Sequence, residues 1–425
     1  MAGTGCEDYR VSTHLDLLTG DAAAGLLDAA VATAGGELVD WRVRQVDHRP
    51  GSTTTVAYRA TVRWDGVERS ETLGASVGRA RDGRKPGVVT LSDGDAKVAV
   101  WRFPGDPALP ALPRAFDPAA VEDLLAGLGV GQAERAHPQL KVRAYRPTRR
   151  AVIEASAAAS RVFLKVLRPR KVADLHQRHT LLSRAGLPVP RPLGWSDDGL
   201  LVLSPLHGTE MRSAVRDGGP IPSPLEVLDL LDRLPSEVRD LPRRPAWSES
   251  AEHYAGVIGA ALPAEAGRAA DLAGAVRARL TERGTGADPT HGDLYEAQIM
   301  LTDGRITGLL DVDSAGPGHR ADDLACLVAH LDVLSLVHGS DAAQARYTTR
   351  MRRLAADYAA GFVAAPGGRG ADRSDLATRV AGVLLSLATG PHRVQERGWQ
   401  AATSRRLDVV AAWLDGSRLA GAGPV

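Results

Sequence analysis

Polar side chains between residues 291 and 311 have the types and the spacing expected of a phosphoryl-transfer site. His291-Gly292-Asp293 is followed by Gln298, and Asp311 comes thirteen residues after Gln298. Asp293 could orient an attacking hydroxyl and accept its proton. The amide oxygen of Gln298 and the carboxylate of Asp311 are hard ligands that suit Mg²⁺ held together with substrate phosphates. Because phosphoryl transfer depends mainly on positioning and charge neutralisation, this set predicts a phosphotransferase.

A predicted β-hairpin brings Gln298 and Asp311 together. Two short strands with alternating apolar residues flank Asp303-Gly304, which is a strong type I′ turn sequence. The register expected from this turn sets Met300 opposite Thr307 and Gln298 near Leu309. Asp311 then lies just past the position opposite Gln298, so the two metal ligands converge.

Other charged residues could join this site. Lys165 lies in the apolar strand 161–167, and a cation buried there needs a partner or a ligand. Contact with the α- and β-phosphates of ATP would provide one, and a lysine that reaches the edge of the sheet is the alternative. Asp313 could bind a second metal ion or contact the substrate, with a solvated acid as the alternative. We expect His291 to brace the loop.

The charge balance argues against a protein built around a polyanion. The chain has 425 residues, enough for about two or three domains, with 52 basic and 51 acidic side chains. Residues 141–171 hold ten Lys or Arg and one acid, Glu154. We interpret this cluster as a solvated cationic face turned in part toward ATP phosphates, so we expect no nucleic-acid partner. A nucleic-acid-binding protein remains the weaker alternative.

The cysteine content and the N-terminal sequence predict a cytoplasmic protein. Cys6 and Cys326 are the only cysteines, too few for a disulfide framework or a structural zinc site. The N-terminal residues lack the basic and apolar regions of a signal peptide. No apolar run approaches the length of about 18 residues that a membrane helix needs, so we expect no membrane segment.

Three regions of different texture predict an α+β, bilobal, protein-kinase-like fold with an additional cap. Residues 1–112 contain a probable helix at 21–34 and several strands, which indicates a β-rich N-terminal cap. Residues 113–207 predict a small sheet with a helix after its third strand, the layout of a kinase N-lobe. Residues 208–425 predict a mostly helical C-lobe around the hairpin. Its helices are expected at 225–236, 250–261, 264–282, 321–336, 341–364, 375–388 and 400–415.

The catalytic segment resembles that of the aminoglycoside phosphotransferase-like kinases, which share the bilobal kinase fold. The loop of that family is usually His-Gly-Asp with an Asn five residues after the Asp. Here Asp293 lies in such a loop, and Gln298 takes the place of the Asn, which is similar to the maltokinase branch. Asp311 matches the metal-binding Asp of the family. The resemblance implies Asp293 as the catalytic residue and Gln298 and Asp311 as metal ligands.

The resemblance also implies ATP and Mg²⁺ as cofactors. Residues 146–150, Arg-Pro-Thr-Arg-Arg, resemble the nucleotide loop of the maltokinase branch. Lys165 would hold phosphate, and the adenine would bind near Leu203, Ser204 and Leu206. The family normally supplies a Glu from the next helix to pair with this lysine, but the chain offers Asp174, His176, Gln177 and His179. Either Asp174 pairs with Lys165 or the pairing is lost.

The acceptor implied by the resemblance is a small sugar. Residues 1–112 resemble the cap of maltokinases, and Gln395-Glu396 with Trp399 resembles the sugar-site signature of glucosamine kinases. Glucosamine is therefore the first choice, contacted by Glu396 and Trp399 together with Asp293 and Asp313. A Trp that seals a helix junction is the alternative for Trp399. Tyr295-Glu296 departs from the commoner residues of the family, so the acceptor site could be reshaped.

Alternative functions remain open at this point. Maltose or an aminoglycoside could be the acceptor, and a nucleotide-sensing, pseudokinase-like binding module is the non-enzymatic alternative. We expect a monomer or a weak homodimer. Asp322-Asp323 before an apolar run predicts the acidic start of a helix, with bracing of a loop as a second possibility.

Overall fold

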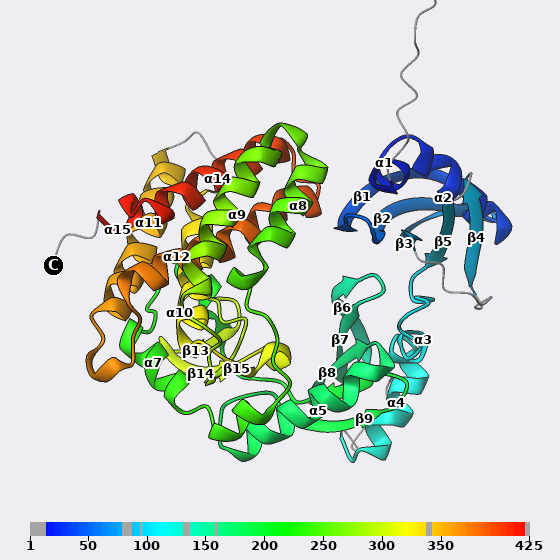
Figure 1. Ribbon diagram of the computed structural model, residues 1–425. Coiled ribbons are helices and arrows are strands. Elements are labelled where there is room, and N and C mark those ends of the chain that lie inside the picture. Colours follow the sequence, from blue (N-terminus) through cyan, green and yellow to red (C-terminus); the bar gives the residue numbers. More distant parts are fainter. Residues whose placement is uncertain are drawn as a thin grey trace, which may run out of the picture.

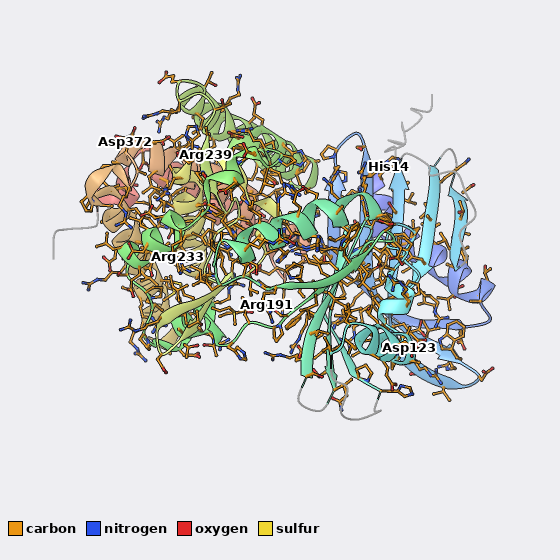
Figure 2. All side chains as sticks on the ribbon, turned by 90° about the horizontal axis from the view of Figure 1, so that it is seen from below. His14, Asp123, Arg191, Arg233, Arg239 and Asp372 are labelled. Atoms are coloured by element: carbon orange, nitrogen blue, oxygen red, sulfur yellow. The ribbon has the colours of Figure 1, made fainter. Side chains whose placement is uncertain are left out.

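The computed structural model describes residues 14–78, 87–93, 96–130, 137–157, 160–336 and 342–420, so Cys6 lies outside the described residues. Figure 1 shows the chain passing from a β-rich cap, through a smaller sheet, into a helical region that carries most of the helices. In Figure 2, the cap with His14 lies on the opposite side of the molecule from Asp372 in the helical region. Both sequence and structure thus give an α+β fold with an N-terminal β sheet and a helical C-terminal region.

The cap is an antiparallel five-stranded sheet in the order β1-β2-β3-β5-β4, packed against two helices. Its elements are α1 (His14–Thr19), α2 (Ala22–Thr33), β1 (Glu37–Arg49), β2 (Thr53–Trp64), β3 (Val67–Gly78), β4 (Val88–Asp93) and β5 (Ala96–Arg102). Leu18, Leu27 and Tyr58 belong to one apolar cluster, and the Tyr58 hydroxyl donates to the Leu18 carbonyl at 2.7 Å. Strand β1 was not expected, because it is a mostly exposed edge strand in which only Val46 is fully buried.

The second sheet is also antiparallel, in the order β6-β7-β8-β10-β9. This N-lobe contains α3 (Leu112–Ala115), α4 (Pro118–Gly127), β6 (Gln139–Arg146), β7 (Arg150–Ala157), β8 (Ser160–Leu167), α5 (Pro169–Arg184), β9 (Pro192–Ser196) and β10 (Leu200–Leu203). The helix α5 follows the third strand, as the sequence predicts. A polar junction joins the lobe to the cap, because Trp101 donates to the Tyr145 hydroxyl at 2.9 Å and Tyr145 donates to Asp106 at 2.9 Å.

The C-lobe is mainly helical. Its helices are α6 (Met211–Asp217), α7 (Pro224–Asp232), α8 (Ala251–Ala261), α9 (Ala266–Thr281), α10 (Arg320–Leu334), α11 (Ala342–Val363), α12 (Arg373–Ala388), α13 (Gly390–Arg393), α14 (Trp399–Leu414) and α15 (Ser417–Ala420). Short 3₁₀ turns are η1 (Ser236–Asp240), η2 (Ser248–Ser250), η3 (Pro263–Glu265), η4 (Val312–Ser314) and η5 (Pro366–Gly368). The strands are β11 (Thr209–Glu210), β12 (Asp288–Thr290), β13 (Ile299–Thr302), β14 (Arg305–Leu309) and β15 (Gly316–Gly318). In the described part of the chain, no helix is long and apolar enough to cross a membrane.

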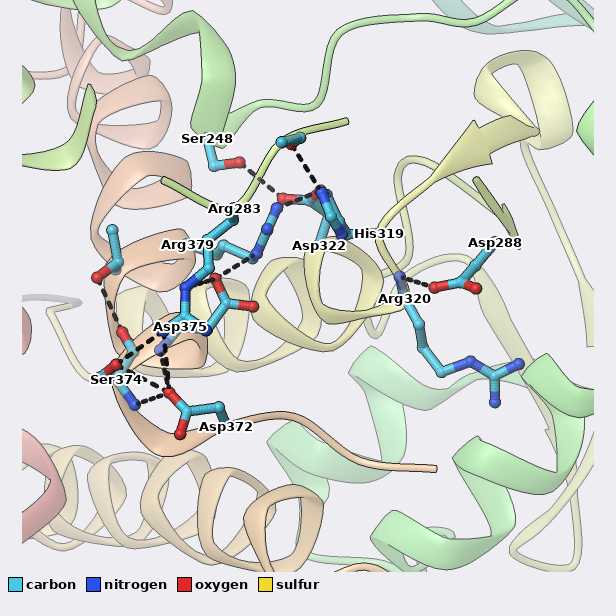
Figure 3. A network of polar contacts seen from close by, with 12 residues as sticks. Ser248, Arg283, Asp288, His319, Arg320, Asp322, Asp372, Ser374, Asp375 and Arg379 are labelled. Carbon is cyan, nitrogen blue, oxygen red and sulfur yellow. Dashed lines mark hydrogen bonds and ion pairs between the residues drawn. The ribbon is translucent and has the colours of Figure 1, made fainter. Parts of the chain in front are cut away.

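A buried polar network holds the start of α10 in place (Figure 3). Asp322 accepts hydrogen bonds from Ser248 at 2.6 Å and from Arg379 at 2.7 Å. Arg379 also bonds Asp375, one turn earlier on α12, at 3.0 Å. The buried charges are therefore paired and hydrogen-bonded, the condition under which a buried ion pair is tolerated.

The strands β13 and β14 form the predicted hairpin, but the predicted register is wrong. Asp303 and Gly304 both have positive φ, 52° and 76°, as a type I′ turn requires. A β-bulge after Met300 then pairs Met300 with Gly308 instead of Thr307. At position 308 a β-carbon would lie 2.8 Å from a Leu206 methyl and 2.9 Å from the Met300 β-carbon, so close packing requires glycine there. Gln298 lies opposite Leu310, whose N–H donates to the Gln298 carbonyl at 2.8 Å.

Candidate active site

The loop that carries Asp293 is braced from two sides. The carboxylate of Asp323 accepts the backbone N–H groups of His291 and Gly292, both at 2.7 Å. The buried His291 ring lies 2.8 Å, through Nε2, from the Leu310 carbonyl, and its Nδ1 accepts the Asp293 N–H at 3.3 Å. Burial lowers the pKa of His291, which favours the neutral ring that these two bonds require. The expected bracing by His291 is therefore observed.

Asp323 does more than form the acidic start of a helix that the sequence predicts. The residue before α10 is His319, and it makes no side-chain cap hydrogen bond. Asp323 lies in the first turn, fully turned toward the loop. Nothing in its spacing relative to Asp293 could have revealed this contact, because the two are brought together by tertiary packing. Both interpretations are therefore observed: Asp322 and Asp323 form the acidic first turn of α10, and Asp323 also braces the loop.

The surroundings of Asp293 bring the pKa of its carboxyl close to neutral pH. Burial, together with the charge of Asp311, raises the pKa of Asp293 to about 7. The Trp247 indole N–H, which donates to Oδ1 at 3.0 Å, and the charge of Arg150 oppose that rise. A general base works best when its pKa is close to the operating pH. Sequence reasoning missed Trp247, which is 46 residues away in the chain and carries no motif.

Lys165 is paired, but not with Asp174, the protein partner considered from the sequence. It is 7% exposed, and its Nζ lies 3.0 Å from Asp311 Oδ1 and also contacts Asp313. Arg150 adds contacts of 3.1 Å to Asp311 and 3.4 Å to Asp313. Asp174 instead pairs with other arginines, namely Arg178 and Arg244. Although burial alone would raise it, the charges of Lys165 and Arg150 lower the pKa of Asp311 well below its ordinary value.

The donor chemistry around Asp311 fits a magnesium ion bound together with phosphates. Asp311 has a left-handed backbone (φ 53°, ψ 50°), which is rare for a non-glycine residue and typical of functional sites. The buried Gln298 lies beside it through the backbone bond to Leu310, and Asp313 follows two residues later. Within the described ranges, no three His, Cys, Asp or Glu side chains form a complete metal site. Mg²⁺ commonly takes one or two carboxylates and completes its shell with water and substrate phosphates.

Two cavities meet at this cluster. One, of about 430 Å³, is lined by Lys165 and Asp311 and by the residues predicted for adenine, Leu203, Ser204 and Leu206. The other, of about 850 Å³, contains Asp293 and Asp313 together with C-lobe residues and residues 45–49 of the cap. Arg150 and Asp311 line both. The structure thus brings the predicted nucleotide residues to one side of the cluster and Asp293 to the other.

Tyr295 and Glu296, the unusual pair in the loop, have separate positions. Tyr295 stacks on His330 with ring centroids 4.1 Å apart, and both line the larger cavity. Glu296 is buried and pairs with Arg212 at 2.7 Å. The guanidinium carbon of Arg212 also lies 5.6 Å from the centroid of the Tyr295 ring, so this ion pair adjoins the aromatic wall of the cavity.

Glu396 and Trp399 are not brought to this cavity. Glu396 is exposed, and neither residue belongs to the cavity lining. Trp399 packs edge-on against His392, with centroids 4.7 Å apart, and His392 itself lines the cavity. This packing at the start of α14 matches the alternative of a Trp that seals a helix junction.

The chain was compared with known proteins. Residues 145–361, just over half of the chain, match the model of the phosphotransferase enzyme family (APH). An uncharacterised protein of Deinococcus radiodurans is 51% identical over 51 residues, which cover 12% of this chain and only 15% of that protein. Choline kinase LicA from Streptococcus pneumoniae is 13% identical over 70% of this chain and 98% of its own, with a TM-score of 0.47. Macrolide 2′-phosphotransferase MphH from Brachybacterium faecium is 19% identical over 69% of this chain and 98% of its own, with a TM-score of 0.39.

The family match covers the parts that meet at the site. It begins at Tyr145, just before the turn that leads to Arg150, and ends within α11. It therefore includes Lys165, the braced loop with Asp293, the hairpin and Asp311. From this match across the site, we conclude that the chain belongs to the phosphotransferase enzyme family.

Proposed function

We propose that the protein transfers the γ-phosphoryl group of ATP, with Mg²⁺, to a hydroxyl of a small sugar. One observation carries this proposal. The carboxylate of Asp293, with a pKa of about 7, lies in the cavity that adjoins the Lys165 and Asp311 cluster. An acceptor hydroxyl in that cavity would meet a proton acceptor on one side and the phosphate-binding cations on the other.

The residues divide the work of the reaction. Lys165 and Arg150 would bind phosphate oxygens, and Leu203, Ser204 and Leu206 would line the adenine pocket. Asp311 would hold the metal ion with Gln298, and Asp313 would bind a second ion or contact the acceptor. Bound Mg²⁺ and ATP would supply charge neutralisation and the transferable phosphoryl group. Asp293 would orient the acceptor hydroxyl and take its proton.

The acceptor is proposed from chemistry and from the sequence signature. Tyr295, His330 and Tyr254 give the larger cavity aromatic surfaces of the kind that pack on sugar rings. Glucosamine remains the first acceptor to test on the sequence resemblance alone, since Gln395-Glu396 with Trp399 resembles the signature of glucosamine kinases but Glu396 and Trp399 lie outside the lining of this cavity. Maltose is the second. A polycationic aminoglycoside is disfavoured, since arginines outnumber the acids in the lining of this cavity. We also propose a cytoplasmic location and a monomer or weak homodimer.

The test is ADP release in the presence of ATP and Mg²⁺ with glucosamine, glucose, maltose and kanamycin. Asp293→Asn should lower turnover by roughly 10²- to 10⁴-fold while ATP binding by calorimetry is retained. Asp303→Asn is the matched control, because Asp303 is exposed at the tip of the hairpin. Near-full activity of Asp293→Asn would refute the assignment. ATP binding without ADP release in the wild type would instead favour a nucleotide sensor.

A further inference from the structure

Arginines from three separate parts of the fold converge on the acceptor side of Asp293. Arg49 comes from strand β1 of the cap, Arg149 from the turn before β7, and Arg393 from α13 of the C-lobe, and all line the larger cavity. Strand β1 also contacts α13, so the cap reaches the C-lobe at this place. Tyr254 of α8 lies among the three: burial raises the pKa of its phenol to about 12, and their charges oppose that rise.

The positive charge of this cluster is only partly balanced. Asp47 pairs with Arg149 at 2.8 Å and lies 3.8 Å from Arg49. For Arg393 and Arg146, which also line the cavity, the described part of the chain provides no ion-pair partner. Burial and the neighbouring arginines lower the pKa of Arg146 to about 10. Arg49, Arg149 and Arg393 are exposed at the rim of the cavity, where like charges repel one another through partly screened fields, and an anion between them would remove that repulsion.

The nucleotide does not account for the whole cluster. Arg150 lines both cavities and contacts Asp311, so it is placed for the phosphates of ATP. Arg49 and Arg393 line only the larger cavity. Arg49 and Arg393 are therefore positioned to contact a bound acceptor and not the nucleotide.

We propose that the acceptor carries an anionic group, a phosphate or a carboxylate, which Arg393 binds together with Arg149 and Arg49. This inference rests on the proposed kinase function and narrows its substrate class to acidic sugars or sugar phosphates. It also gives the cap a purpose, since the cap supplies Arg49 and, through Asp47, holds Arg149. The ion pair between Arg149 and Asp47 would hold the cap and the turn before β7 in fixed relative positions when the anion binds.

The experiment compares neutral or cationic acceptors with relatives that carry an anionic group at carbon 6. Glucosamine is compared with glucosamine 6-phosphate, and glucose with glucuronate, by ADP release in the wild type, Arg393→Gln and Arg397→Gln. Arg397 is exposed, four residues away, and outside the cavity lining, which makes it a matched control. We expect kcat/KM to favour an anionic acceptor. Arg393→Gln should raise the KM for that acceptor by about 10- to 100-fold, the usual effect of losing a charge-assisted contact, with the KM for ATP unchanged.

Other outcomes separate this inference from the proposed function. Efficient turnover of neutral acceptors alone, unaffected by Arg393→Gln, would overturn the anionic acceptor and leave the kinase standing. A rise in the KM for ATP in Arg393→Gln would also overturn the anionic-acceptor proposal, because Arg393 would then contact the nucleotide. If no acceptor supports ADP release, calorimetric titration with inorganic phosphate in the presence of saturating ADP tests whether the anion subsite exists. Binding weakened at least about 10-fold by Arg393→Gln but not by Arg397→Gln supports the subsite, and absence of binding rejects it.

Discussion

Replacing Asp323 by Asn tests whether the brace beneath the catalytic loop is as important as its geometry indicates. The two carboxylate oxygens of Asp323 each accept one backbone N–H at 2.7 Å, from His291 and from Gly292. Asn keeps the shape of the side chain but has only one acceptor oxygen. Its NH₂ group would face the second backbone donor, so one buried N–H would lose its partner and be opposed by another donor.

The magnitude follows from the lost hydrogen bond. A hydrogen bond to a charged group contributes about 1.5–3 kcal/mol, and an unsatisfied buried donor costs about 1–3 kcal/mol. Removing a buried charge offsets part of this, so we expect a loss of about 2 kcal/mol in the free energy of unfolding. For a unit the size of the C-lobe, this corresponds to a fall of roughly 4–8 °C in Tm. Turnover should fall by at least about 10-fold as well, because the loop that positions Asp293 loosens.

Differential scanning calorimetry and urea unfolding measure the loss of stability, and ADP release measures turnover. Asp357→Asn is the matched control: Asp357 is exposed on α11 and makes a surface pair with Arg353, which contributes less than about 1 kcal/mol. If Asp323→Asn melts within about 1 °C of the wild type and keeps its turnover, the carboxylate does not brace the loop, and this reasoning fails.

Further predictions concern single positions. Desolvation and nearby arginines lower the pKa of the half-buried His330 to about 3. The unfolded chain therefore binds a proton there below the ordinary histidine pKa, and stability falls as the pH drops below about 6.5. His330→Phe should keep the ring and remove about 2 kcal/mol of the wild-type loss between pH 7 and pH 5, measured by urea unfolding at both values. Gly292→Ala should lower Tm and turnover together, because Gly292 has φ 78° and a β-carbon would lie 2.5 Å from the Ser314 carbonyl oxygen. Asp174→Asn should leave the KM for ATP within about twofold of the wild type, since Asp174 does not contact Lys165, and a larger change would show that the two are coupled.

The parts of the site that the sequence predicted are those set by local spacing. The turn at Asp303-Gly304 needs positive φ at both positions, and this requirement is visible in the residue types themselves. The seven predicted helices of the C-lobe all occur within a few residues of their expected bounds, although α10 and α12 are buried on most sides and are not amphipathic. The short helices α6, α13 and α15 were not predicted. Leu203, Ser204 and Leu206 meet Lys165 because neighbouring strands of one small sheet carry them or lead to them.

The parts that the sequence did not predict depend on contacts between distant segments. A one-residue bulge after Met300 shifts the register of the hairpin. Leu206, which packs against Gly308 at this place, belongs to the segment between β10 and β11 and is therefore distant in sequence. Strand β1 escaped detection although Trp41 and Val43 alternate with Arg42 and Arg44, because this alternation covers only part of the strand and adjoins polar residues on both sides. The position of Trp247 beside Asp293 has no signal in a single sequence. Periodicity reports which face of an element is buried, but it does not report what that face meets.

The ion pairs around Lys165 show how this chain balances the lysine charge without a partner acid on α5. Two cations, Lys165 and Arg150, balance two carboxylates, Asp311 and Asp313, within about 3.4 Å of one another. None of the four therefore stays uncompensated, which would be costly in a site so well buried. When phosphates and a metal ion bind, the cations would turn to the phosphates and the carboxylates to the metal. This exchange keeps opposite charges together throughout, so it removes the need for a separate acid on α5.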